Sequence, residues 1–230
     1  MKVVVLIPVH NEAGLIGATV GAAREIPGVS QVIVINDGST DNTAAIAAGA
    51  GAVVVDMPCN AGKGAALTAG WQHAPADVYL LLDGDLGRTA YFGRLLLEPI
   101  VMGSADMTIA RFQARQAWRG GRMGFGLVRR FAVWVVKRYG GVELSSPLSG
   151  QRAVRAEVVQ QAGGFAEGFG VEISLTLHAI WAGFRVQEVE VPMKHRPTGR
   201  GLKGFWHRGR QLLHIIRTLR RCLKERSQVC

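Results

Sequence analysis

The chain of 230 residues lacks any uninterrupted apolar stretch that approaches the roughly 20 residues needed to span a bilayer. Its apolar N-terminal run breaks at Pro8 and no small-residue cleavage site follows, so we expect no signal peptide. Cysteine is scarce, and Cys59, Cys222 and Cys230 are odd in number and lack metal-ligand spacing. Reduced thiols in the cytoplasm fit this pattern best.

Acidic residues are absent from one long segment and almost absent from another. Residues 111–138 carry eight arginines and lysines and no acid, and residues 200–230 carry nine against the single Glu225. The rest of the chain has 10 basic and 16 acidic residues, so the net charge of +10 comes from these two segments. The pattern points to an anionic partner such as a phosphorylated substrate, a membrane surface or nucleic acid, although two solvated helix faces would give the same pattern.

Two common nucleotide-binding fingerprints are also missing. No G-x-G-x-x-G follows the first apolar run, which argues against a dinucleotide dehydrogenase. Gly62-Lys63 lacks the earlier glycine at Walker spacing and the following Ser or Thr, which excludes a P-loop ATPase. The expected strands carry no interleaved aromatic and basic residues for stacking, so we do not expect a nucleic-acid partner.

The first half of the chain alternates short apolar runs with segments of helical spacing. Apolar runs bounded by turn residues predict strands at 2–7, 31–35, 52–55, 78–82 and 107–110. Helical spacing, with start signals at Asn11, Asp41 and Thr89, predicts helices at 12–25, 42–50, 63–73 and 89–101. We therefore expect an α/β fold, a mostly parallel sheet flanked by helices, that binds ligands at the carboxyl ends of its strands.

The second half is less regular. A basic, glycine-rich loop over 111–126 precedes helices expected at 127–139 and 172–182 and a strand expected at 185–191. Residues 205–226 are expected to form one helix whose apolar stripe consists of Leu212, Ile215, Ile216, Leu219 and Leu223. Arginine and lysine dominate its other faces, so this helix either lies in an anionic membrane interface or packs its stripe back onto the domain.

Polar turns follow the first four expected strands, and they read PVHNE, NDGSTD, PCNAGKG and DGDLG. Parallel strands would bring these turns to one edge of the sheet. The carboxylates of Glu12, Asp37, Asp83 and Asp85 would repel one another there. A cation, or the hydroxyl and amide groups of a sugar and a base, would relieve that repulsion.

Two features of this edge suit a diphosphate and a metal. Lys63 stands between glycines at a helix start, where backbone N–H groups and its own charge suit phosphate. Asp83 and Asp85 follow a buried strand, and Mg²⁺ or Mn²⁺ is commonly held by one or two such carboxylates together with water and substrate phosphate. Asp-Gly-Asp alone is more often a turn, but here it precedes a helix and not a hairpin, which favours a metal site for a nucleotide.

Four stretches, VLIPVHNEAGLIGATV, VIVINDGSTDNTA, NAGKGAALTAGW and VYLLLDGDL, resemble the family-two-type glycosyltransferases of GT-A fold, which use nucleotide-diphospho-sugars. Three later stretches, GGRMGFGLVRR, PLSGQRAV and GFGVEISLTLHAIWAGFRVQEVEVPMKHR, are similar in the same order to the glucosyl-3-phosphoglycerate synthase branch. The resemblance implies a GT-A domain over 1–199, with a nucleotide-sugar-binding half at 1–110 and an acceptor-binding half at 111–199. A basic amphipathic C-terminal tail follows at 200–230.

The resemblance also implies residue roles. Those implied to bind the donor are Pro8, Glu12, Asp37, Ser39, Gly62, Lys63 and Asp83. Those implied to bind the acceptor are Gly121, Arg122, Ser149 and Gly150. Those implied to hold the metal are Asp83, Asp85 and His195, and those implied in catalysis are Asp85, Glu172 and Lys63.

Three of these implied roles have alternatives. A histidine after a strand, as at His195, is as readily structural, and an acid at a helix start, as at Glu172, is favoured by the helix dipole alone. The synthase branch has Arg-x-Thr in its acceptor loop, whereas Met123 and Gly124 follow Arg122 here. The identity of the acceptor therefore stays open.

The expected reaction is attack of an acceptor oxygen on the anomeric carbon of a nucleotide-diphospho-sugar. Mg²⁺ or Mn²⁺, Lys63 and Arg196 would stabilise the leaving diphosphate, and Glu172 is the candidate general base for a hydroxyl acceptor. UDP is favoured over GDP and glucose over other sugars.

The alternatives are a polyprenyl-phosphate acceptor at the inner face of the membrane and a non-catalytic nucleotide-sugar-binding protein. An anionic membrane surface and a second copy of the chain are further partners left open.

Overall fold

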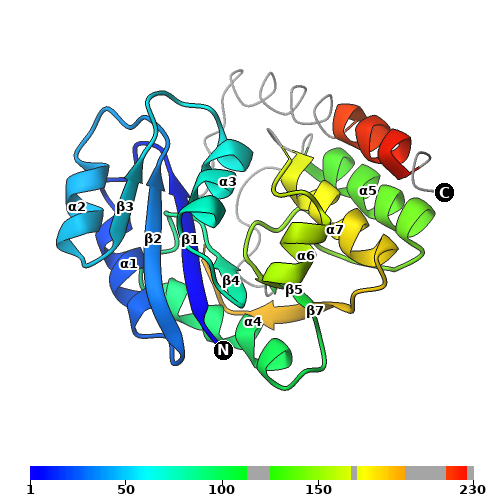
Figure 1. Ribbon diagram of the computed structural model, residues 1–230, viewed down its shortest axis with the longest axis horizontal. Helices are drawn as coiled ribbons and strands as arrows, with labels where there is room; N and C mark the ends of the chain where they lie inside the picture. Colours follow the sequence, from blue (N-terminus) through cyan, green and yellow to red (C-terminus); the bar gives the residue numbers. More distant parts are fainter. Residues whose placement is uncertain (113–124, 167–169, 195–215, 227–230) are drawn as a thin grey trace.

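The computed structural model describes residues 1–112, 125–166, 170–194 and 216–226, and all structural statements concern these residues. They form one seven-stranded sheet in the order β3-β2-β1-β4-β6-β5-β7 (Figure 1). The strands are β1 (Val3–Val9), β2 (Val29–Asn36), β3 (Val53–Asp56), β4 (Val78–Leu81), β5 (Met107–Phe112), β6 (Arg152–Arg155) and β7 (Val186–Val191). β6 is antiparallel to both of its neighbours, and the other paired strands are parallel. The expected α/β fold with a mostly parallel sheet is confirmed.

Helices cover both faces of the sheet. They are α1 (Ile16–Arg24), α2 (Thr43–Gly49), α3 (Lys63–His73), the 3-10 helix η1 (Gly87–Gly93), α4 (Arg94–Val101), α5 (Phe125–Val135), the π-helical turn η2 (Val136–Gly140), α6 (Ala156–Gln161) and α7 (Val171–Trp181). Side chains alternate along β1, so Val5 and Ile7 pack in the core beneath α1 and α4, whereas Val4 and Leu6 pack in the core beneath α3 and α7. Burial on both faces explains why the strands read as continuous apolar runs.

The start signals expected for two helices were wrong. Asn11 adopts a left-handed backbone (φ 56°), and α1 begins only at Ile16 after a turn in which the Glu12 carbonyl accepts the Leu15 N–H. Thr89 does not begin a helix: it lies inside η1, which runs into α4. The bounds of α3 match the prediction for 63–73.

Two elements were missed, β6 and α6. β6 is four residues long and contains two arginines, so neither alternation nor an apolar run reveals it. α6 follows β6 directly and is only six residues long, too short for a helical period to be recognised.

The described part of the C-terminal tail, a helix at 216–226, packs on the domain beside α5 and α7 (Figure 1). Leu219 and Cys222 are buried, and the Arg226 guanidinium lies 4.8 Å from the ring centroid of Trp181 in α7. Of the two arrangements expected for the tail, packing of the apolar stripe onto the domain is therefore observed for these residues. Within the described ranges, no helix combines the length and apolarity needed to cross a bilayer.

The fold predicts opposite effects for two glycine substitutions within helices. A methyl group at Gly70 in α3 would lie 2.7 Å from Ile35 and 3.1 Å from Leu6, whereas one at Gly21 in α1 would meet nothing within 4 Å. We expect Gly70→Ala to lower the free energy of unfolding, because overpacking costs about 1–3 kcal/mol. Gly21→Ala should raise it by up to about 1 kcal/mol through helix propensity. Urea unfolding measures both, and a stabilised Gly70→Ala would contradict this packing.

Candidate active site

The polar turns after β1, β2 and β4 meet at one edge of the sheet, as expected. β1 pairs in parallel with both β2 and β4, with Val9 opposite Asn36 and Leu6 opposite Leu81. The pairing continues one residue into the second turn, where the Asp37 N–H donates to the Val9 carbonyl at 2.8 Å. The residues that follow these three strands therefore leave the sheet side by side.

Asp37 ties the third turn to the second. The residue is 5% exposed, and its carboxylate accepts the backbone N–H groups of Ala61 at 2.7 Å and Gly62 at 2.8 Å. Gly38, next to it, has φ +69°, and a Cβ there would lie 2.8 Å from the Asn60 nitrogen, so only glycine fits. Asp37 therefore fixes the loop that leads into Lys63 through two hydrogen bonds to its backbone.

The first and second turns are also joined to each other. Ser39 Oγ accepts the Asn11 N–H at 3.0 Å, and the Asn11 side-chain carbonyl accepts the Thr40 N–H at 2.8 Å. The Glu12 N–H donates to Thr43 Oγ1 at 2.8 Å. These bonds place Glu12 and Ser39 on adjoining turns, as expected for two residues of one site.

Lys63 is the centre of a charged cluster built from three separate elements. Its ammonium, at the first residue of α3, lies 2.8 Å from Asp83 Oδ1 and 3.3 Å from Glu172 Oε1 in the first turn of α7. The second Asp83 oxygen accepts a hydrogen bond from Gln151 Nε2 at 2.6 Å. The structure therefore brings together Lys63, Asp83 and Glu172, which lie far apart in the sequence.

The electrostatics of this cluster keep Lys63 charged. Burial alone lowers the pKa of the Lys63 ammonium, but attraction to Asp83 and then to Glu172 outweighs burial and raises the pKa above the ordinary lysine value. A raised pKa means that the ion pairs contribute to stability throughout the neutral range, and that this contribution is lost only as the pH rises through the folded-state pKa.

Ser149 and Gly150, expected on the acceptor side, adjoin this cluster. A Cβ built on Gly150 would lie 2.3 Å from Lys63 Nζ and 3.2 Å from each Asp83 carboxylate oxygen. Ser149 is buried, and its hydroxyl donates to Gln151 Oε1 at 3.3 Å. The loop before β6 therefore closes directly over the ion pair of Lys63 and Asp83.

Sequence reasoning missed Arg152, which anchors that loop. The residue is 1% exposed. Its guanidinium donates to the carbonyls of Ser149 at 2.8 Å and Pro147 at 2.7 Å, and to Thr176 Oγ1 of α7 at 2.8 Å. Burial lowers the pKa of Arg152 to about 10, while Glu172 acts in the opposite direction. No sequence signal distinguishes this buried arginine from the exposed arginines around it.

A second missed residue, Thr19 of α1, supports the Asp-Gly-Asp turn. Its buried hydroxyl donates to the Gly84 carbonyl and accepts the Gly87 N–H, each at 2.8 Å. A Cβ on Gly84 would approach a Val9 methyl to 2.6 Å, so the turn lies tightly against β1. These contacts fix the backbone between Asp83 and Asp85.

The donor set at this turn fits a hard divalent cation. Asp83 and Asp85 offer carboxylate oxygens, the ligands that Mg²⁺ and Mn²⁺ prefer, and both side chains are half-buried at the edge of the site. Lys63 and Gln151 contact the two Asp83 oxygens, so a metal would share that carboxylate with them. The residues present therefore suit the expected metal.

Four expected site residues, Gly121, Arg122, His195 and Arg196, lie outside the described residues. Lys194, the last described residue before His195, donates its N–H to Thr89 Oγ1 at 3.2 Å. Thr89 follows the Asp-Gly-Asp turn closely in the sequence. The chain is therefore held near the end of this turn at Lys194.

The contact between Gly150 and Lys63 can be tested by a double-mutant cycle. Gly150→Ala should lower the free energy of unfolding by about 1–3 kcal/mol, because the new methyl group crowds Lys63 Nζ. In a Lys63→Met background, which lacks Nζ, the penalty should shrink by about 1 kcal/mol, measured by urea unfolding. Gly14→Ala is the matched control, since nothing lies within 4 Å of its methyl group. A Gly150→Ala penalty of the same size in the parent and Lys63→Met backgrounds would refute the contact.

Comparisons with known proteins identify the family of this chain. The family model described as "Glycosyl transferase family 2" matches residues 4–123. Glycosyltransferase AglJ of Haloferax volcanii is 30% identical over 201 residues, which are 86% of this chain and 64% of the relative. Glucosyl-3-phosphoglycerate synthase of Mycobacterium tuberculosis is 29% identical over 194 residues, 75% of this chain and 59% of that protein. The chain thus spans less than two thirds of the length of these two relatives.

Other relatives extend the range of acceptors and supply structures. An undecaprenyl-phosphate 4-deoxy-4-formamido-L-arabinose transferase of Edwardsiella ictaluri is 26% identical over 95% of this chain and 67% of its own length. The crystal structure of the M. tuberculosis synthase with Mn²⁺, UDP-glucose and phosphoglyceric acid is 28% identical, with a TM-score of 0.78, over 96% of this chain and 79% of that one. The fold, the turns and the family match together show that this chain belongs to glycosyl transferase family 2.

Proposed function

We propose that this protein transfers a sugar, with glucose favoured, from a nucleoside diphosphate sugar to an anionic acceptor with the help of a divalent metal. The observation that carries the proposal is the cluster of Lys63, Asp83 and Glu172 under Gly150, at the carboxyl edge of the sheet. The similarity to the synthase crystallised with Mn²⁺, UDP-glucose and phosphoglyceric acid supports UDP as the nucleotide and a small phosphorylated acceptor.

The donor would lie across the three joined turns. Glu12, Asp37 and Ser39 are proposed to hold the base and ribose together with Pro8, and Asp37 also supports the loop that leads into Lys63. The diphosphate would then extend toward Lys63 and the N-terminus of α3, where a charge and backbone N–H groups suit it.

The reaction forms a bond between the anomeric carbon and the acceptor oxygen and breaks the bond from that carbon to the β-phosphate oxygen. Asp83 and Asp85, with His195 as a further proposed ligand, would hold Mg²⁺ or Mn²⁺, which would supply positive charge to the leaving diphosphate. Lys63 adds a fixed positive charge that Asp83 and Glu172 hold in place before the donor arrives.

Proton transfer depends on the acceptor. A hydroxyl acceptor must lose a proton, and we assign Glu172 as the base, because its half-buried carboxylate lies beside Lys63 in the same cluster. A phosphate or carboxylate acceptor reaches the site already ionised and needs no base. Arg122, with Gly121, Ser149 and Gly150, is proposed to bind the anionic group.

Replacement of both metal-site aspartates tests the proposal. Asp83→Asn with Asp85→Asn should weaken Mn²⁺-dependent UDP binding at least tenfold, about 1.4 kcal/mol, because an amide carries no charge for the metal. Isothermal titration with UDP, with and without Mn²⁺, measures this loss. Asp77→Asn is the matched control, since Asp77 immediately precedes β4, at the opposite end of that strand from the site. Equal UDP affinity in the double variant and in the parent chain would refute the metal role.

Turnover separates an enzyme from a non-catalytic nucleotide-sugar-binding protein. Release of UDP from UDP-glucose in the presence of 3-phosphoglycerate, and formation of the glucosylated product, should require Asp83, Asp85 and Mn²⁺. UDP-glucose binding with no turnover, across a panel of phosphorylated, carboxylated and lipid-phosphate acceptors, would favour the binding protein.

One observation favours a polyprenyl phosphate at a membrane surface as a second candidate acceptor. Trp134 on α5 is 51% exposed and stacks on Phe131, and Arg129 and Arg130 on the same helix are exposed. Arg129, Arg130, Trp134 and Lys137 line an open groove of about 480 Å³. An exposed tryptophan among basic side chains suits the interface of an anionic bilayer. The undecaprenyl-phosphate transferase relative also supports this candidate.

The second candidate predicts lipid binding through α5 and not through the helix at 216–226. Trp134→Ala combined with Arg129→Gln and Arg130→Gln should abolish co-flotation with vesicles containing anionic phosphatidylglycerol. Met102→Ala, which removes a 79% exposed apolar side chain elsewhere, should float as the parent chain does. Flotation that persists in the triple variant, or that is equal with neutral vesicles, would exclude this surface.

A further inference from the structure

Three different metal-ligating side chains meet where the 216–226 helix packs on α7. His178 of α7 and Cys222 and Glu225 of the 216–226 helix each place one ligand atom within 4.8 Å of the other two. None of the three belongs to the cluster of Lys63, Asp83 and Glu172, and the proposed transfer reaction uses none of them. His178, Cys222 and Glu225 thus join α7 to the helix at 216–226, which we call the tail helix.

The hydrogen bonds of His178 direct one ring nitrogen toward an acid. Nδ1 lies 2.8 Å from the Ser174 carbonyl, which can only accept, so Nδ1 carries the proton. Nε2 then presents its lone pair toward Glu225 Oε2, 3.5 Å away. A lone pair facing a carboxylate is unfavourable unless a proton or a metal ion lies between them. A histidine that donates through Nδ1 to a carbonyl and binds through Nε2 has the arrangement usual for metal ligands.

The other two side chains are oriented toward the same point. Glu225 uses Oε1 for an ion pair with Arg221 at 2.9 Å, so Oε2 is the oxygen that faces His178. Cys222 is 2% exposed, and its Sγ lies 3.5 Å from Ser174 Oγ. Glu225 is 44% exposed, which gives an ion a path from solvent and gives the carboxylate room to move.

We propose that His178, Cys222 and Glu225 bind one Zn²⁺ ion, with water as the fourth ligand. One nitrogen, one sulfur and one oxygen ligand suit tetrahedral zinc, which accepts all three, better than they suit Mg²⁺ or Ca²⁺, which select oxygen. Bonds of about 2.0–2.3 Å at tetrahedral angles require ligand atoms about 3.5 Å apart, so the side chains must draw together by about 1 Å. His178 Nε2 and Glu225 Oε2 are already 3.5 Å apart, so the remaining approach must come from a change of the Cys222 rotamer toward them.

The charges balance when zinc binds. The Cys222 thiol releases its proton to solvent, and the thiolate and the Glu225 carboxylate together offset the two positive charges of the ion. No electron is transferred. Arg221 pairs with Glu225 Oε1 and Arg226 lies over the Trp181 ring, so neither cation uses the Glu225 oxygen that faces His178 in these contacts.

The bound ion would link the tail helix to α7. α7 carries Glu172 in its first turn and His178 in its last turn. Zinc would therefore hold the tail helix against the element that supplies the proposed base, through a site separate from the Mg²⁺ or Mn²⁺ site.

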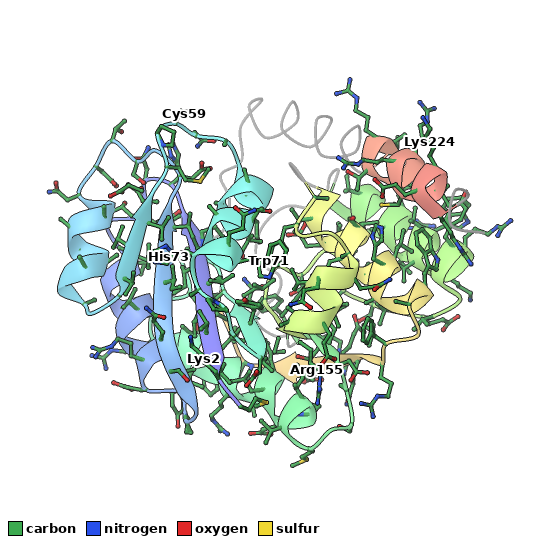
Figure 2. The ribbon with its side chains drawn as sticks, in the orientation of Figure 1. Lys2, Cys59, Trp71, His73, Arg155 and Lys224 are labelled. Atoms are coloured by element: carbon green, nitrogen blue, oxygen red, sulfur yellow. The ribbon has the colours of Figure 1, made fainter. Side chains whose placement is uncertain are left out.

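The test uses the full chain in saturating Mg²⁺, which fills the proposed Asp83 and Asp85 site, with Co²⁺ and Zn²⁺ as the probes. One equivalent of Co²⁺ should then give thiolate charge-transfer absorption in the near ultraviolet, and Zn²⁺ should displace it. His178→Gln, Cys222→Ser and Glu225→Gln should each weaken binding at least tenfold. Cys59→Ser and Cys230→Ser are the matched controls and should keep the absorption. Cys59 lies in the turn after β3, at the opposite side of the molecule from Lys224 of the tail helix (Figure 2).

The outcomes separate zinc from a plain ion pair of His178 with Glu225. Absence of thiolate–cobalt absorption, or its survival in Cys222→Ser, would overturn the proposal, as would its loss in Cys59→Ser or Cys230→Ser. Because Cys222 is buried, thermal unfolding checks the fold of that variant. Glu225→Gln decides independently at a more exposed position: Zn²⁺ should raise the melting temperature of the parent chain and leave that of Glu225→Gln unchanged. An equal rise in both would refute the site.

Discussion

The Lys63 ammonium, held between Asp83 and Glu172, is the interaction on which the arrangement of the site depends. One charge joins the start of α3, the turn after β4 and the first turn of α7. Half-buried carboxylates at this edge would repel one another without it. Gly150 has no side chain, and this allows the loop before β6 to lie directly against the ion pair.

Buried polar groups around that interaction limit how far it can move. Asp37 fixes the loop before Lys63, Thr19 fixes the turn that carries Asp83, and Arg152 fixes the loop that covers both. Each makes two or more hydrogen bonds to backbone groups or to a neighbouring helix. A site held in this way would already be organised before a donor binds, which is the condition for electrostatic stabilisation of a leaving diphosphate.

The meeting of the turns after β1, β2 and β4 at one edge could be predicted from sequence because it depends on local rules. Glu12, Asp37 and Asp83 follow apolar strands directly, and parallel strands bring such residues to one edge whatever the details of packing. The packing of Gly150 on Lys63 could not be predicted, since it depends on how a strand inserted late in the chain pairs with β4. Arg152 and Thr19 were missed for a related reason: an arginine in a strand and a threonine in a helix become anchors only when their tertiary partners are known.

The direction of β6 has a consequence for how this fold can diversify. Because β6 runs antiparallel to β4, the residues that enter β6, and not those that leave it, lie at the edge where the β4 turn emerges. The loop over Lys63 is therefore the end of the connection between β5 and β6. The spacing of the turns after β1, β2 and β4 does not constrain the length of that connection. Under the proposed function, insertion or exchange in that connection would change acceptor preference while β1, β2 and β4 keep their register.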